Sequence, residues 1–224
     1  TMTATAETTY VRTADPVRRQ RLGIAAVTLA VTGVIALVGG VLWPEPAGGD
    51  WYAYADVAPI RDRWWTLLTV LAVSAAVAIP LQALAAMALV RQRGAGWATW
   101  GGAAMFLGTG LQVTGVAGWA ALYYFATDPS GDPAAVAPLL ETAGDDLRLF
   151  GVAAAGALIV ALGTAAQAVG LWRSGALPRW VPIVSLAIVP TFFLPNSGPL
   201  GLITGIPISV AAAAIGYYAW RRAA

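Results

Sequence analysis

Six stretches of this chain contain no ionised side chain, and this feature constrains the fold most strongly. Five of them exceed the 20 or so residues that a helix needs to cross roughly 30 Å of hydrocarbon. A charge inside that layer is costly, so long uncharged runs are typical of transmembrane helices. The predicted spans cover residues 22–43, 64–90, 97–125, 149–172, 180–194 and 199–220. We therefore expect an all-α, polytopic membrane bundle of six helices.

The composition agrees with a membrane protein, because 58% of the residues are hydrophobic and only 11% are charged. In a typical soluble domain, about a quarter of all residues are charged. We expect a disordered N-terminus over residues 1–20 and one six-helix transmembrane domain over 21–222, with long outer loops near 44–63 and 126–148. The fifth span is short and contains or borders three prolines, so it is predicted to be kinked: Pro182, Pro190 and Pro195.

The charges orient the predicted bundle. All thirteen cationic residues are arginine, and only three of them fall on the predicted outer side: Arg61, Arg63 and Arg148. The positive-inside rule then predicts that both termini are cytoplasmic and that the protein is a multi-pass protein of the plasma membrane. Nine carboxylates lie in the two outer loops. Anionic lipid headgroups account for the basic inner face, so membrane lipids are expected as partners and nucleic acid is not.

The residue types exclude several chemistries. The chain has no histidine, cysteine or lysine, which rules out serine-histidine catalysis, zinc and haem sites that need His or Cys, and Schiff-base cofactors. The paired aspartate-rich motifs that hold magnesium diphosphate in membrane prenyltransferases are also missing. We therefore predict no metal and no cofactor. Carboxylate acid-base chemistry and aromatic faces remain.

Aromatic and acidic residues gather on the predicted outer side. The first outer loop reads GDWYAYADVAPIRDRWW, and the third span ends in GWAALYYFATDPSGD. Within that span Gln112, Val116, Trp119 and Tyr123 share one helix face, which leads from mid-membrane to the outer surface. Trp and Tyr also form ordinary belts at the headgroup level. An aromatic belt and a pocket are both open interpretations of the outer group.

The pocket interpretation assigns a proton donor and a lining. A carboxylic acid buried against Trp rings loses hydration of its charged form and can stay protonated as a general acid, while aromatic faces stabilise passing cations. The candidate acids are Asp50, Asp56 and Asp62. The candidate substrate-binding residues are Trp51, Tyr54, Trp64, Trp65, Gln112, Trp119 and Tyr123.

Simpler roles are open for the same polar residues. Asp62 is placed to cap the second predicted helix, and Asp145 or Asp146 to cap the fourth. The glutamines Gln82, Gln112 and Gln167 are expected to form hydrogen bonds between helices, worth about 1 kcal/mol each.

Two resemblances add expectations. The segments LWRSGALPRWVPIVSL, ALVRQRGAG and GYYAWRR resemble those of small six-span membrane proteins typical of actinobacteria, most of them uncharacterised. The chain length, span number and outer aromatic-carboxylate group resemble, more distantly, the bacterial integral-membrane terpene cyclases of indole sesquiterpenoid and meroterpenoid pathways. The second resemblance implies protonation-initiated cyclisation of a hydrophobic isoprenoid substrate.

Two other functions compete with cyclisation. A six-span bundle with an outer loop over aromatic residues also resembles the substrate-binding subunits of vitamin importers, in which aromatic rings would stack on a flat ligand. A non-catalytic structural or accessory membrane protein is the third interpretation, in which belts and helix caps explain every residue.

Overall fold

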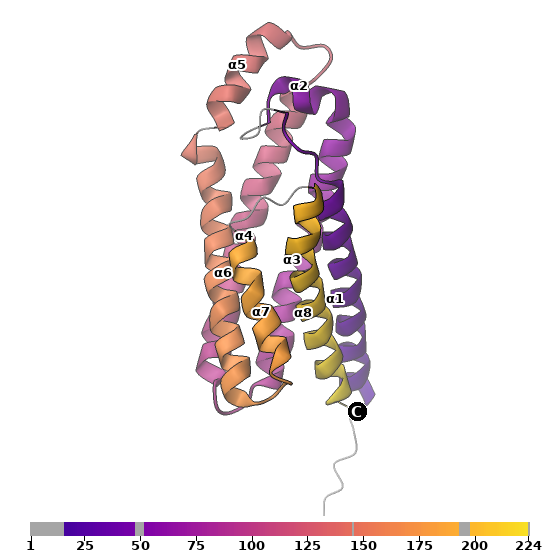
Figure 1. Cartoon of the computed structure of the whole chain (residues 1–224), viewed down its shortest axis with the longest axis vertical. Coiled ribbons are helices and arrows are strands. Elements are labelled where there is room, and N and C mark those ends of the chain that lie inside the picture. The colour runs from indigo at the N-terminus through magenta and orange to yellow at the C-terminus, as the bar shows by residue number, and fades with distance from the viewer. Residues whose placement is uncertain (1–15, 48–51, 145, 193–197, 224) are drawn as a thin grey trace, which may run out of the picture.

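The computed structural model describes residues 16–47, 52–144, 146–192 and 198–223. These residues form helices and no strands, as predicted. The five long helices are α1 (Pro16–Leu42), α3 (Arg61–Leu89), α4 (Ala95–Ala126), α6 (Leu147–Ser174) and α8 (Gly198–Arg221). Figure 1 shows these five helices side by side, with a cap of short helices at one end.

Five helices within the described ranges are long and apolar enough to cross a membrane. The fifth predicted span becomes α7 (Trp180–Thr191), which has 12 residues and is about 18 Å long. Its prolines Pro182 and Pro190 lie in its first and last turns, where a missing N–H or a bend is tolerated best. α7 packs between α6 and α8.

Several predicted boundaries differ from the structure. Helix α1 already begins at Pro16, inside the segment expected to be disordered, because a proline suits the first turn of a helix. The first predicted outer loop contains α2 (Tyr54–Val57) and the short η1 (Ala58–Ile60). The second contains α5 (Pro133–Gly144), an Ala- and Leu-rich segment whose N–H at Ala134 donates to the Asp132 carboxylate.

Small residues hold the helices in two close pairs, α4 with α6 and α1 with α8. A Cβ atom at Gly108 would lie 2.7 Å from the Gly156 carbonyl oxygen, and one at Gly101 would lie 2.6 Å from the Gln167 nitrogen. The pair α1 and α8 meets at Gly40 and Gly201 in the same way. Close backbone approach of this kind is the usual basis of helix association in lipid.

Helix α3 joins the two pairs, since it packs against both α4 and α1. The amide of Gln167 on α6 donates to the Ala83 carbonyl of α3 over 3.2 Å. This bond is one of the interhelical contacts that the sequence predicts for glutamine. It pairs Gln167 with a backbone oxygen rather than with Gln82, which is buried nearby on α3.

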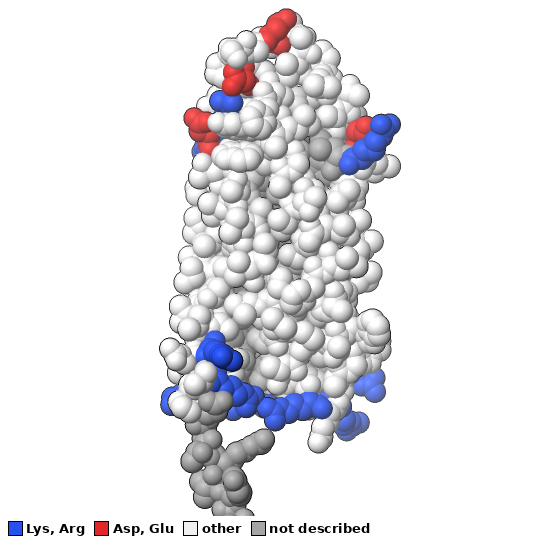
Figure 2. All heavy atoms as spheres, turned by 180° about the vertical axis from the view of Figure 1, so that it is seen from behind, with Lys and Arg blue, Asp and Glu red and all other residues white. Residues whose placement is uncertain are grey.

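Charge is confined to the two ends of the bundle. Figure 2 shows a white, uncharged body with arginines at the lower end and acids mainly at the upper end. The described acids all lie at the upper end, which we call the acidic end: Glu45, Asp56, Asp62, Asp128, Asp132, Glu141 and Asp146. The start of α1 and the end of α8 meet at the opposite, arginine-rich end, where the Arg19 guanidinium lies 5.9 Å from the Trp220 ring.

Candidate functional site

The acidic end of the bundle encloses a group of rings, which we call the aromatic cluster. Its members come from the end of α1, the segment before α2, the start of α3, the end of α4 and the start of α6: Trp43, Tyr52, Trp64, Trp119, Tyr123 and Phe150. Neighbouring ring centroids lie close, for example 4.7 Å for Tyr52 with Trp64 and 4.9 Å for Trp64 with Trp119. Such distances are those of favourable edge-to-face aromatic pairs.

Tyr52 ties the cluster together. Its hydroxyl oxygen accepts from the Trp43 indole N–H over 2.6 Å and donates to the Pro44 carbonyl over 2.6 Å. The Tyr123 hydroxyl, which is fully buried, donates to the Tyr52 carbonyl over 3.0 Å. Burial raises the pKa of Tyr52 to about 12, and the nearby carboxylates of Asp56 and Glu45 add to the rise while the Trp43 hydrogen bond opposes it.

Among the described residues, three buried polar atoms in this part of the bundle lack a well-formed hydrogen bond: the indole nitrogens of Trp64 and Trp119 and the side-chain oxygen of Gln112. The Trp119 indole N–H interacts with the Tyr123 hydroxyl, so the Trp64 N–H is the donor left without an acceptor. Trp64 is 1% exposed and Trp119 is 8% exposed. A buried donor without a partner costs about 1–3 kcal/mol, so native proteins contain few of them. The Trp64 N–H is therefore the part of the cluster that its own side chains leave incomplete.

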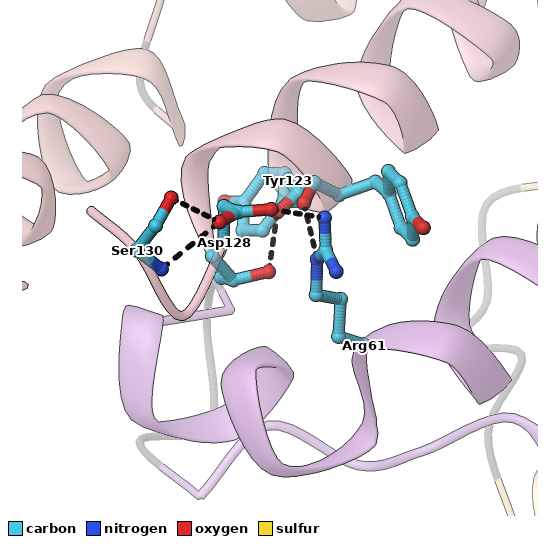
Figure 3. Close-up of polar contacts among 6 residues, drawn as sticks. Arg61, Tyr123, Asp128 and Ser130 are labelled. Carbon is cyan, nitrogen blue, oxygen red and sulfur yellow. Dashed lines mark hydrogen bonds and ion pairs between the residues drawn. The ribbon is translucent and has the colours of Figure 1, made fainter.

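Beside the cluster, a set of polar contacts joins the start of α3 to the end of α4 and the residues just after it. Arg61, at the start of α3, donates through Nε to the Tyr124 carbonyl and through a terminal nitrogen to the Asp128 carboxylate, both over 2.8 Å. Its guanidinium carbon lies 3.9 Å from the centre of the Tyr124 ring. Figure 3 shows Asp128 between Arg61 and Ser130. The hydroxyl and N–H of Ser130 lower the pKa of Asp128, and Arg61 lowers it further.

The candidate acids occupy different places. The oxygens of Asp56 accept the N–H of Ala53 over 2.9 Å and the N–H of Ala47 over 3.2 Å, so this carboxyl fastens the loop at the end of α1 to the start of α2. Asp62 is exposed in the first turn of α3. Asp50 lies outside the described residues.

The candidate lining residues also separate. Trp64, Trp119 and Tyr123 lie in the cluster, and Tyr54 packs against its edge. Trp65 pairs with Tyr124 instead, over 5.2 Å, and is 37% exposed. Gln112 lies on the same face of α4 as Trp119, seven residues earlier, about 10 Å along the helix. Trp51 lies outside the described residues.

Comparisons with protein families, with curated proteins and with solved structures gave no match. Across the described ranges, no group of three or more acidic side chains lies together as a metal site would require. The candidate functional site is therefore the aromatic cluster.

Sequence reasoning missed three members of the cluster as site residues: Tyr52, which lies in the first outer loop, and Trp43 and Phe150. Trp43 stacks on Trp119 with centroids 6.1 Å apart, and Phe150 meets the same ring edge-on at 5.4 Å. Each stands at the outer limit of an apolar run, where a belt residue is the ordinary expectation. Their shared position at one membrane level was the only signal that could have grouped them with Trp119.

Proposed function

We propose that this protein binds an amphipathic, isoprenoid-like molecule in the aromatic cluster at the acidic end of its bundle. The observation that carries the proposal is the buried indole N–H group of Trp64, which has no acceptor among the described residues. A ligand oxygen beside it would satisfy this donor. Ligand sites commonly combine mostly apolar walls with a few convergent polar groups in this way.

The surrounding residues fit the rest of such a molecule. Aromatic faces and aliphatic side chains, such as Leu68 and Leu140, form an apolar wall around the two indoles. The free oxygen of Gln112 lies deeper along the same helix face and can accept a hydrogen bond from a hydroxyl group. An elongated molecule with an oxygen at one end therefore matches the chemistry better than a compact polar solute does.

Entry of the ligand requires a ring to move, because the rings of the cluster contact one another. Tyr52 is our candidate for that ring, since it lies before α2 rather than within a long helix. Its displacement would break its hydroxyl bonds to Trp43 and Pro44 and open the space above Trp64.

Cyclisation of the bound molecule is the second candidate function, and the electron-rich ring faces favour it because they stabilise carbocations. The hydrogen bonds of Asp56 are those of a carboxylate that accepts rather than of an acid that donates. Asp62 is exposed to the surroundings of the cap. Asp50 is therefore the first acid to replace in a test of cyclisation, followed by Asp56 and Asp62.

We also propose the orientation in which the acidic end is exoplasmic. The arginine-rich end, with both termini, would then be cytoplasmic in a plasma membrane, and the short α7 would be one of six crossings. The site would accordingly receive its ligand from the outer leaflet.

A binding titration tests the proposal. Farnesol, an isoprenoid alcohol, is expected to quench the tryptophan fluorescence of the purified protein saturably, and a hydrocarbon of the same length without oxygen is expected to bind at least tenfold more weakly. Trp64→Phe removes the unpartnered donor and should weaken farnesol binding about tenfold. Trp43→Phe is the matched control, because its indole already has a partner.

Equal binding by Trp64→Phe and Trp43→Phe would contradict the proposal, as would equal binding of the alcohol and the hydrocarbon. For the cyclisation candidate, Asp50→Asn, Asp56→Asn and Asp62→Asn are assayed with an isoprenoid epoxide. Unchanged turnover in all three would remove the enzymatic function and leave binding. Stable co-purification with an ATPase and a coupling subunit would assign that binding to import.

A further inference from the structure

We propose that a groove between α4 and α6, at the arginine-rich end of the bundle, binds one acyl chain of an anionic phospholipid whose headgroup lies at the arginines beside it. The groove has a volume of about 450 Å³. Its walls include Gly96, Trp97, Trp100 and Ala104 of α4 and Leu162 and Ala166 of α6. It lies at the end of the molecule opposite the aromatic cluster, so this inference does not depend on the proposed function.

The groove follows from the way the two helices pack. Gly101 and Gly163 meet backbone to backbone and form the floor, because neither has a side chain to fill the space above the contact. Larger residues rise on either side, with Trp100 78% exposed and Leu162 61% exposed. At Gly96 the position of a Cβ atom has no other atom within 4 Å. The result is an open apolar channel rather than a closed seam.

The dimensions suit an acyl chain. The groove runs along α4 from Gly96 to Ala104, a rise of about 12 Å. One leaflet contributes about 15 Å of hydrocarbon, half of the bilayer core. A chain that lies along the groove would therefore be covered for most of its depth in that leaflet, with the Trp97 indole near the headgroup level where such rings are favoured.

The charge at the end of the groove selects the headgroup. Arg91 and Arg93 are exposed in the turn before α4, and Arg173 is exposed in the last turn of α6. Gly94 and Gly170 touch at this point, which brings the two helix ends together. The described acids all lie at the far end of the bundle (Figure 2). A phosphate group offers these guanidinium groups the anion that the protein does not supply here.

A second copy of the chain is the competing occupant, since small residues also favour helix pairing. Copies inserted in one membrane share one orientation, so pairing at this groove would bring the same arginine-rich turns together. The arginines of two copies would repel each other, which disfavours a dimer at this groove. A lipid with a negative headgroup would instead attract them.

The test compares two lipids and two matched pairs of variants. Full-length protein in micelles is titrated with dioleoylphosphatidylglycerol or dioleoylphosphatidylcholine, and bound lipid is counted by native mass spectrometry. The unaltered protein should retain one phosphatidylglycerol in preference to phosphatidylcholine, by about fivefold for each arginine engaged. Arg93→Gln should reduce this preference about fivefold, whereas Arg148→Gln, at the acidic end, should not change it.

Gly96→Leu fills the groove and should weaken phosphatidylglycerol binding at least tenfold. Gly110→Leu is its control, because Gly110 lies on the same helix and its Cβ position is equally open. Equal retention of the two lipids, or equal binding by the two leucine variants, would overturn the proposal. A dimer that Gly96→Leu abolishes and Gly110→Leu does not would also overturn it, and would assign the groove to a second copy.

Discussion

At the scale of single residues, the acidic end contains polar groups of two kinds. Some are fully bonded, such as Tyr52, Asp56 and Arg61, and these fasten the cap to the bundle. Others are buried without a partner among the described residues, as in Trp64 and Gln112. The first kind stabilises the fold and the second reduces stability, because a lost hydrogen bond in a buried setting is not replaced by water. The proposed ligand acts on the second kind.

Two glutamines test this distinction directly. Gln167 donates to the Ala83 carbonyl, so Gln167→Leu should lower the free energy of unfolding by about 1 kcal/mol. Gln112 has an unpartnered oxygen, so Gln112→Leu should change that energy little or raise it slightly. Reversible unfolding in mixed micelles, followed by circular dichroism, measures both. A larger loss in Gln112→Leu would show that its oxygen has a partner.

The raised pKa of Tyr52 predicts that the acidic end of the bundle loses stability at alkaline pH. Because its pKa is raised from 10.0 to about 12, the folded protein prefers the neutral phenol. The resulting stability is fully present below about pH 10 and is lost as the pH rises toward about 12. The full loss should reach roughly 3 kcal/mol, because the pKa rises by about 2 and each pKa unit is worth 1.36 kcal/mol, and about half of it should be present at pH 11. Urea titrations at pH 8 and pH 11 measure it, and Tyr52→Phe should abolish most of the difference; an unchanged difference would locate the transition elsewhere.

At the scale of elements, the pair α4 and α6 is the most closely packed part of the fold, because glycines allow its backbones to touch. The same feature produces the lipid groove, where the floor is glycine but the rims are large. Helix α3 then carries Trp64 to the cluster, and α4 carries Trp119 and Tyr123 on its inward face. The positions of these rings therefore depend on the glycine contacts below them.

Alanine substitutions at Gly108 and Gly110 distinguish the effect of helix packing on stability from that of helix propensity. Gly108→Ala introduces a Cβ atom 2.7 Å from the Gly156 carbonyl oxygen and should lower the free energy of unfolding by about 2 kcal/mol. Gly110→Ala meets open space and should raise it by up to about 1 kcal/mol, since alanine favours a helix over glycine. Thermal unfolding of both variants in one detergent provides the comparison. Similar values for the two would contradict the close contact.

At the scale of the whole molecule, the chain places its charges at two ends of an uncharged body, which five long apolar helices form. The absence of cysteine allows the orientation to be tested with single substitutions. An impermeant maleimide added to intact cells should label Ala135→Cys on α5, but should label Arg222→Cys only after the cells are opened. Labelling of Arg222→Cys in intact cells would reverse the proposed orientation.

The long helices could be predicted from the sequence because hydrocarbon excludes charge, so each uncharged run marks the body of a helix. The short helices and loops at the acidic end could not be predicted this way. The pairing of Asp56 with Ala47, and of Trp43 with Tyr52, depends on how a nonhelical segment folds back, which no periodicity records. Trp119 and Tyr123 were identifiable because helical spacing alone puts them on one face.

The proposed function requires that the buried indole N–H of Trp64 donates a hydrogen bond to a ligand oxygen. Protein labelled with ¹⁵N at its tryptophans shows each indole N–H as a separate NMR signal, which Trp-to-Phe variants assign. On addition of farnesol, the Trp64 signal should shift downfield and exchange its hydrogen more slowly, with smaller changes for Trp43. An unmoved Trp64 signal at saturating farnesol would contradict the proposed function.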